Sequence, residues 1–271
     1  MTPRLCLALQ VWSGDVYIAQ RLARLICEIE PNKREDIEFL ISARKDTNKF
    51  AVRELGSIVR EKFKTVEVHF GRRHGIGWPA GSNCLWADTM THSISLHRES
   101  KLKSDGILTF EADCLPLRPD WINRLAEEWE NRGNAHCVGH VHTFHAEQGP
   151  THINGNAIFA WDFLTRYPQF LGAPDTSGWD AWHGKLLLQI GKDTDMISQL
   201  YRLGIKKGPD GTDIDDPLPR STIEGFRKNG KVPAMWHGLK FESGIDAVEH
   251  MLGDGTFYRR ALVDEPELNL I

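Results

Sequence analysis

Apolar runs alternate with helical patterns over the first half of this 271-residue chain, and that alternation restricts the fold more than any other feature of the sequence. Near-continuous apolar runs are typical of strands that are buried on both faces of a sheet. Such a run occurs at residues 5–12, and further strands are predicted at 36–43, 66–70 and 106–110. Patterns with helical spacing follow them at 16–26, 50–63, 84–97 and 119–131. Strands that alternate with helices of this length need crossover connections, so the sequence predicts an α/β fold with a mixed, mainly parallel sheet flanked by helices.

The second half of the chain is less regular. Short strands are predicted at 136–142 and 156–161, and helices near Thr165 and Asp180. Residues 204–233 are rich in Gly, Pro, Asp and Lys, which predicts long loops. With 41% hydrophobic and 26% charged residues, a chain of this length can bury one large core. We therefore expect a single globular domain over residues 1–271.

Cysteine content and charge restrict the compartment and the partners. The five cysteines are scattered and form no C-x-x-C pair, which argues against a zinc ribbon and a disulfide framework and fits a reducing compartment. The net charge of -4 gives no overall basic field, although a local basic patch would still serve a nucleic acid. The apolar run near the N-terminus is too short for a signal peptide or a membrane span. We expect a cytoplasmic protein without a membrane partner.

Two carboxylates stand at the end of the strand predicted at 106–110. Glu111 and Asp113 follow this strand with one residue between them. Because ligands of open α/β sheets bind outside the carboxyl ends of the strands, this acid pair can converge on a divalent cation or on a bound nucleotide. The alternative is a strand that ends in a polar turn with solvated acids.

The segment from Ile107 to Pro116, followed by a helix that starts at Pro119-Asp120-Trp121, resembles the D-x-D region of GT-A glycosyltransferases. Glu111 stands where this family usually has the first Asp. The resemblance implies a GT-A fold of the Rossmann-like type. It also implies a nucleotide-sugar donor and a Mn²⁺ or Mg²⁺ ion that is bound by Asp113, with Glu111 and a late histidine, His237.

Other segments occur in the order of the GT-A pattern, over about residues 5–240. The first strand and its loop, the loop at 77–83 and the small-residue segment at 154–157 correspond to the parts that face the donor. The resemblance then implies that residues 1–133 bind the nucleotide sugar and that 134–271 bind the acceptor. The residues assigned to the donor in this way are Val11, Trp12, Asp15, Asn83, Glu111, Ala112 and Asn156. Arg72, just before the Gly-rich loop, is a further candidate because its charge suits the diphosphate, and the alternative is a solvated turn.

Asp180 lies between two tryptophans at a predicted helix start. In inverting GT-A enzymes, an acid at this chain position deprotonates the acceptor hydroxyl, and aromatic surroundings raise the pKa of a carboxyl by desolvation. The alternative is a helix N-cap with Trp179 as a hydrophobic staple. Asp175 and Asp162 are the next candidates for the base.

Histidines gather between His136 and His152. His140 and His142 share a strand face, which allows a zinc site, but neither a Cys nor an acid accompanies them at a recognised spacing. We interpret these histidines as strand-edge and loop residues.

The predicted activity is transfer of a sugar from a UDP-sugar to an acceptor hydroxyl, with inversion. The chain resembles compact phage and base-J-type enzymes that glucosylate hydroxymethylpyrimidines in DNA, which makes such DNA a candidate acceptor and host cytoplasm the compartment if a phage encodes the chain. Trp179 and Trp182 would stack on a base, and lysines and arginines at 206–231 would meet phosphates. The rival functions are a sugar nucleotidyltransferase, whose Gly-rich loop after the first strand is absent here, and a non-catalytic nucleotide-sugar or carbohydrate-binding module.

Overall fold

The computed structural model describes residues 4–133, 135–142, 151–199, 225, 232–237, 248–250, 252–253 and 255. Internal contacts divide the chain into two compact units. The first comprises Met1–Ala112 and Ala126–Thr194, and the second comprises Asp113–Leu125 and Asp195–Ile271. The expected single domain with a boundary at 133/134 stays a prediction.

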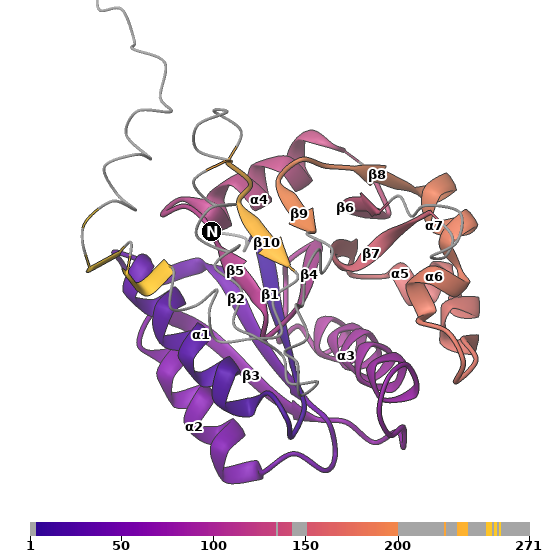
Figure 1. Cartoon of the computed structure of the whole chain (residues 1–271), viewed down its shortest axis with the longest axis horizontal. Helices are drawn as coiled ribbons and strands as arrows, with labels where there is room; N and C mark the ends of the chain where they lie inside the picture. Colours follow the sequence, from indigo (N-terminus) through magenta and orange to yellow (C-terminus); the bar gives the residue numbers. More distant parts are fainter. Residues whose placement is uncertain are drawn as a thin grey trace, which may run out of the picture. The chain divides into compact units, whose positions relative to one another are not determined.

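A seven-stranded sheet forms the centre of the first unit, with strand order β3-β2-β1-β4-β7-β6-β8 (Figure 1). The pairs β1–β2, β2–β3, β1–β4 and β6–β8 are parallel, and β7 is antiparallel to both of its neighbours. The predicted mixed, mainly parallel sheet is confirmed. The strands are β1 (Leu5–Val11), β2 (Arg34–Ala43), β3 (Phe63–Phe70), β4 (Gly106–Glu111), β6 (Cys137–His142), β7 (His152–Ala160) and β8 (Gly191–Asp193).

Helices cover both faces of this sheet. α1 (Val16–Ile29) and α2 (Lys49–Arg60) connect β1 to β2 and β2 to β3, whereas α3 (Ala80–Arg98) leads back across the sheet to β4. Right-handed crossovers therefore place α1 and α2 on one face and α3 on the other, as Figure 1 shows. The remaining helices are α4 (Trp121–Asn131), α5 (Phe163–Arg166), the 3₁₀ helix η1 (Pro168–Gly172), α6 (Trp179–Trp182) and α7 (Gly184–Ile190).

The core on the α3 face contains an aromatic cluster. The rings of Trp86 and Trp179 stack with their centroids 3.6 Å apart, and Phe159 packs edge-on against Trp86. Trp179 is only 5% exposed. The prediction that Trp179 stacks on an acceptor base is therefore wrong, because its ring fills the space between α3 and β7.

Several predicted boundaries need correction, among them the strand predicted at 156–161, which is observed as β7 at His152–Ala160. The helix predicted to reach residue 63 ends at Arg60, and Phe63 instead begins β3, where its side chain is buried and its backbone pairs with Arg34. The helix predicted from residue 84 begins at Ala80, because Gly81 N and Asn83 N already donate helical hydrogen bonds to Gly77 O and Pro79 O. The side chain of Asn83 thus belongs to the first turn of α3 rather than to a loop.

A small sheet with strand order β5-β10-β9 lies in the second unit. β10 (Met235–His237) is antiparallel to β5 (Cys114–Pro116) and parallel to β9 (Ile197–Gln199). The sequence analysis predicted none of these three-residue strands. Most of the predicted loop at 204–233 lies outside the described residues. No helix in the described part of the chain is long and apolar enough to cross a bilayer.

Candidate active site

The strand order of the first unit reverses between β1 and β4. β2 and β3 extend the sheet on one side of β1, and β4 starts the other side. In open α/β sheets, ligands bind outside the carboxyl ends of the strands at such a reversal. The carboxyl ends here are adjacent, since Gln10 pairs with Glu111. The segments after β1 and β4 therefore begin at the edge of the sheet where a ligand of such a fold binds.

The end of β4 is held by asparagines of β7. Glu111 N donates a 2.9 Å hydrogen bond to Asn156 Oδ1, and Asn156 Nδ2 donates a 3.0 Å hydrogen bond to Asn154 Oδ1. Asn156 is 5% exposed and Ala112 is buried. The segment 154–157 thus fixes the backbone from which Glu111 projects, a role that the resemblance did not assign to it.

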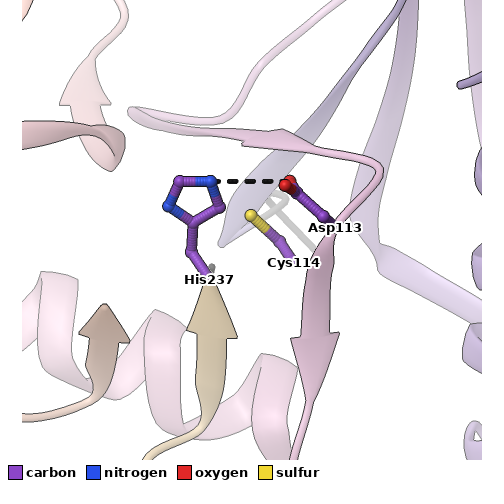
Figure 2. A group of neighbouring side chains, drawn as sticks. All are labelled: Asp113, Cys114 and His237. Carbon is purple, nitrogen blue, oxygen red and sulfur yellow. Dashed lines mark ion pairs between the residues drawn. The ribbon is translucent and has the colours of Figure 1, made fainter. Parts of the chain in front are cut away.

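Asp113, Cys114 and His237 form a cluster of metal-binding side chains in the second unit (Figure 2). Asp113 Oδ1 lies 3.5 Å from His237 Nε2, and one ligand atom of each of the three residues lies within 4.8 Å of the others. The pairing of β5 with β10 sets Cys114 directly opposite His237. The structure therefore brings together Asp113 and His237, which are 124 residues apart in the sequence.

The cluster fits a divalent cation. Asp113 Oδ1 is buried and accepts no hydrogen bond from any residue that the structure describes, so a cation would satisfy this oxygen. A carboxylate with an imidazole suits Mn²⁺ and Zn²⁺, and a thiolate favours softer ions. Cys114 was missed by the sequence reasoning. Glu111, the other expected ligand, is not a member of this cluster, and its contact with a metal stays a prediction.

The loop after β1 forms a tight turn with an exposed aromatic ring. Trp12 N donates a 2.8 Å hydrogen bond to Asp15 Oδ1, and Asp15 N donates one of 3.2 Å to Trp12 O. The Trp12 indole lies over Gly14, where an added Cβ would collide with the ring, and it is 46% exposed. The side chain of Val11 is fully buried. Of these three residues assigned to the donor, Trp12 thus presents an accessible side chain, while the Asp15 carboxylate shapes the turn.

Asp88 anchors the loop after β3. Arg72 N and Arg73 N donate hydrogen bonds of 2.7 and 2.9 Å to Asp88 Oδ2, and Arg73 Nε lies 3.2 Å from Asp88 Oδ1. The Arg72 side chain is exposed, as a contact with a diphosphate requires. The only sign of this anchor in the sequence is the presence of one acid, Asp88, within the helix predicted at 84–97.

The Asn83 amide holds the segment before α6. Its Nδ2 donates to Ser177 O at 2.9 Å and to Pro174 O at 3.3 Å, and its Oδ1 accepts from Trp179 N at 2.9 Å. These three bonds give Asn83 a structural role besides the donor contact that the resemblance implies.

Asp180 connects α6 to β7. Its Oδ2 accepts a 2.9 Å hydrogen bond from Gly155 N and lies 3.7 Å from His152 Nε2, and its Oδ1 accepts from Ala181 N. The N-cap of α6 is Gly178, so the alternative of an Asp180 cap is wrong. Among the other candidate bases, Asp162 pairs with Arg166 at 2.7 Å, and Asp175 is exposed.

The described histidines of the 136–152 group line β6 and β7. His142 pairs directly with His152, and their ring centroids are 6.0 Å apart. His136 instead packs edge-on against Tyr167, and His145 lies outside the described residues. The described members do not form a group with the spacing of metal ligands.

Comparison with known proteins identifies the fold. No protein-family profile matches the sequence, and no curated protein matches it. Three similar solved structures are the apo form of the bifunctional glycosyltransferase WbbM, the glycosyltransferase GlyE of Streptococcus pneumoniae TIGR4 and an active-site mutant of LgtC. Their TM-scores are 0.55, 0.52 and 0.50, with sequence identities of 11, 10 and 10%.

These matches extend over most of the chain. They cover 96, 90 and 92% of it, and 52, 56 and 95% of the respective known chains, so the chain spans about half the length of WbbM and GlyE. At these identities the likeness shows the fold alone, and the expected GT-A fold is confirmed.

Proposed function

We propose that this chain is a metal-dependent glycosyltransferase that moves a sugar from a UDP-sugar to an acceptor hydroxyl, with inversion. The observation that carries the proposal is the Asp113–His237 pair in a chain with the GT-A fold. Asp113 follows the buried strand β4 closely, as the second acid of a D-x-D region does.

The proposed metal ligands are Asp113 and His237, with Glu111 as a further ligand to be tested. The side chains of Asp113 and His237 are 10% and 12% exposed, so a bound ion would still be accessible to a diphosphate. A divalent ion at this position supplies positive charge against the charge that builds on the leaving diphosphate.

Trp12 is the proposed platform for the nucleotide base. Its indole is exposed and packs on the Gly14 backbone, and the Asp15 carboxylate stabilises the turn by accepting a hydrogen bond from Trp12 N. A rigid aromatic face binds a base by stacking, at a small cost in side-chain entropy. Arg72 would contact the diphosphate from the loop after β3.

Asp180 is the proposed base. The hydrogen bond from Gly155 N fixes Asp180 Oδ2, and His152 Nε2 lies close to the same oxygen. The side chain is 18% exposed, which leaves it within reach of an acceptor hydroxyl. It would take the proton of that hydroxyl as the oxygen attacks the anomeric carbon.

A hydroxymethylpyrimidine in DNA is the acceptor that we propose to test first. Trp182, one residue beyond Ala181, is 58% exposed and is available to stack on a base, whereas Trp179 is part of the core. The basic residues at 206–231 that were expected to meet phosphates lie outside the described residues.

The activity is tested by incubating the protein with labelled UDP-glucose and Mn²⁺, first alone and then with duplex DNA that contains 5-hydroxymethylcytosine or 5-hydroxymethyluracil. Slow donor hydrolysis that EDTA abolishes supports the enzyme, and a pure binding module shows none. Label transfer to DNA that decreases steeply with salt supports the acceptor. Strong transfer to a glycan or peptide, with no label on either DNA, would exclude it.

A further inference from the structure

Cys114 has an unusual position for a buried cysteine. It pairs directly with His237 across β5 and β10, and directly paired residues of antiparallel strands point to the same side of the sheet. Figure 2 shows the Cys114 sulfur and the Asp113 carboxylate both turned toward the His237 ring. The backbone register therefore directs the Cys114 sulfur and the His237 imidazole to the same side of the sheet, and the Asp113 carboxylate, just before β5, joins them.

Other cysteines of this chain have surroundings of a different kind. Cys6 and Cys137 belong to the apolar core of the first unit, where burial raises the pKa of each thiol strongly. Cys27 Sγ donates a hydrogen bond to Ile58 O. Cys114 is as buried as these, at 1% exposed, but its sulfur lies among the side chains of a carboxylate and an imidazole.

We propose that Cys114 is a direct ligand of the metal ion, so that the site has mixed oxygen, nitrogen and sulfur donors and prefers a thiophilic divalent ion such as Zn²⁺ or Co²⁺ over Mg²⁺. This inference rests on the proposed function of the Asp113–His237 pair. On binding, the thiol loses its proton to solvent and the sulfur forms one bond to the ion, so the ion changes neither its oxidation state nor that of the cysteine.

The geometry needs a modest adjustment for this ligand set. On a tetrahedral ion with bonds of about 2.3 Å to sulfur and about 2.0–2.2 Å to nitrogen or oxygen, two ligand atoms lie roughly 3.3–3.7 Å apart. The Asp113 oxygen and the His237 nitrogen already have this spacing, at 3.5 Å, and the three ligand atoms lie within 4.8 Å of one another. Side-chain movements on the order of one ångström would therefore close the site.

The selectivity follows from the softness of the donors. Thiolate ligands select zinc and related ions, whereas an all-oxygen site suits Mg²⁺ and Mn²⁺. A protein with Cys114 on the metal should thus bind Zn²⁺ and Co²⁺ more tightly than Mg²⁺.

The experiment uses Co²⁺ as a spectroscopic probe of the full chain, with Zn²⁺ in a second measurement. Thiolate coordination gives Co²⁺ an intense charge-transfer absorption in the near ultraviolet. We expect this band in the wild type, its loss in Cys114→Ser, and its retention in Cys84→Ser, a matched control in which a partly exposed cysteine elsewhere is removed. Because Cys114→Ser could misfold, X-ray absorption of the Zn²⁺-loaded wild type gives a test without substitution, with a Zn–S distance of about 2.3 Å expected.

The outcomes separate this inference from the proposed function. Wild-type protein that binds Co²⁺ without the band, with Zn²⁺ surrounded by nitrogen and oxygen alone, would overturn the role of Cys114 and leave the Asp113–His237 site intact. A band that disappears in Cys84→Ser and not in Cys114→Ser would overturn it too. No Co²⁺ or Zn²⁺ binding at all, together with donor turnover that EDTA does not affect, would refute the metal site itself.

Discussion

At the scale of single residues, backbone hydrogen bonds position two of the side chains that we propose for the chemistry. Gly155 N donates a hydrogen bond to the Asp180 carboxylate, and the backbone amide of Glu111 donates one to the Asn156 side chain. Asp113 differs from both, because its buried Oδ1 has an imidazole at 3.5 Å and accepts no hydrogen bond from the described residues. A buried carboxylate oxygen without a hydrogen-bond donor is energetically costly, and a bound cation would remove that cost.

Asp113→Asn should abolish metal-dependent turnover and leave the protein folded. The substitution removes the negative charge that attracts the ion, but it keeps the size of the side chain. We expect calorimetry to detect no Mn²⁺ or Co²⁺ binding in the variant and unfolding to remain cooperative. Asp195→Asn, a change to an exposed acid of the same unit, is the matched control and should behave like the wild type. Normal turnover by Asp113→Asn would show that the metal assignment is wrong.

Asp180→Asn separates the proposed base from a purely structural brace. Asn Oδ1 can still accept the hydrogen bond from Gly155 N, so the packing of α6 on β7 should persist. If Asp180 takes the acceptor proton, kcat for transfer should decrease about 10²–10⁴-fold while donor affinity is unchanged. The measurement is single-turnover transfer together with donor binding by calorimetry. A decrease of only a few-fold would show that Asp180 has a structural role, and Asp175 would then be the next candidate for the base.

At the scale of elements, the sequence predicts what local periodicity encodes. β1, β2 and β4 are buried over nearly their whole length, so their apolar runs are visible in the sequence. The three-residue strands β5, β9 and β10 are too short to show a period, and they exist through pairing between distant segments. The contact of Cys114 with His237 depends on that register. Asp113 and His237 could be predicted from the GT-A resemblance, whereas Cys114 could not.

The packing of α3 on β3 creates a histidine pair that should make stability depend on pH. His92 stacks on His69 with ring centroids 3.8 Å apart, and burial lowers the pKa of His92 from 6.5 to about 4 and also lowers the pKa of His69. The unfolded chain then binds more protons than the folded one between these pH values. Stability should consequently decrease as the pH is lowered from 6.5 toward 4.

Melting temperatures over this pH range test the histidine pair. His92→Gln removes one titrating group, so its melting temperature should depend less steeply on pH than that of the wild type. His74→Gln, at an exposed histidine, serves as the control and should keep the wild-type slope. Equal slopes in all three proteins would show that the His69–His92 stack does not contribute to the acid sensitivity.

At the scale of the whole molecule, the strand order of the main sheet restricts where a ligand can bind. The reversal between β1 and β4 brings the Trp12 turn and the Glu111 end of β4 to neighbouring positions of one sheet edge. The mainly parallel sheet follows from the alternation of strands and helices in the sequence. The antiparallel β7 does not, because its direction is set by the connection through β6 and by the hydrogen bonds of Thr109 and Asn156.

Donor binding should stabilise the folded chain in a metal-dependent way. A ligand that binds only the native state adds about 2.7 kcal/mol at a hundred times its dissociation constant. For a chain of this size, that corresponds to a rise in melting temperature of roughly 5 °C. We expect this rise with a UDP-sugar and Mn²⁺ or Co²⁺ together, and a much smaller rise with the donor in EDTA, because the ion then cannot join the diphosphate to Asp113 and His237. Uridine, which has no diphosphate, is the control ligand, and its effect should not depend on the metal. Equal stabilisation by the UDP-sugar with and without the ion would contradict a metal-held diphosphate.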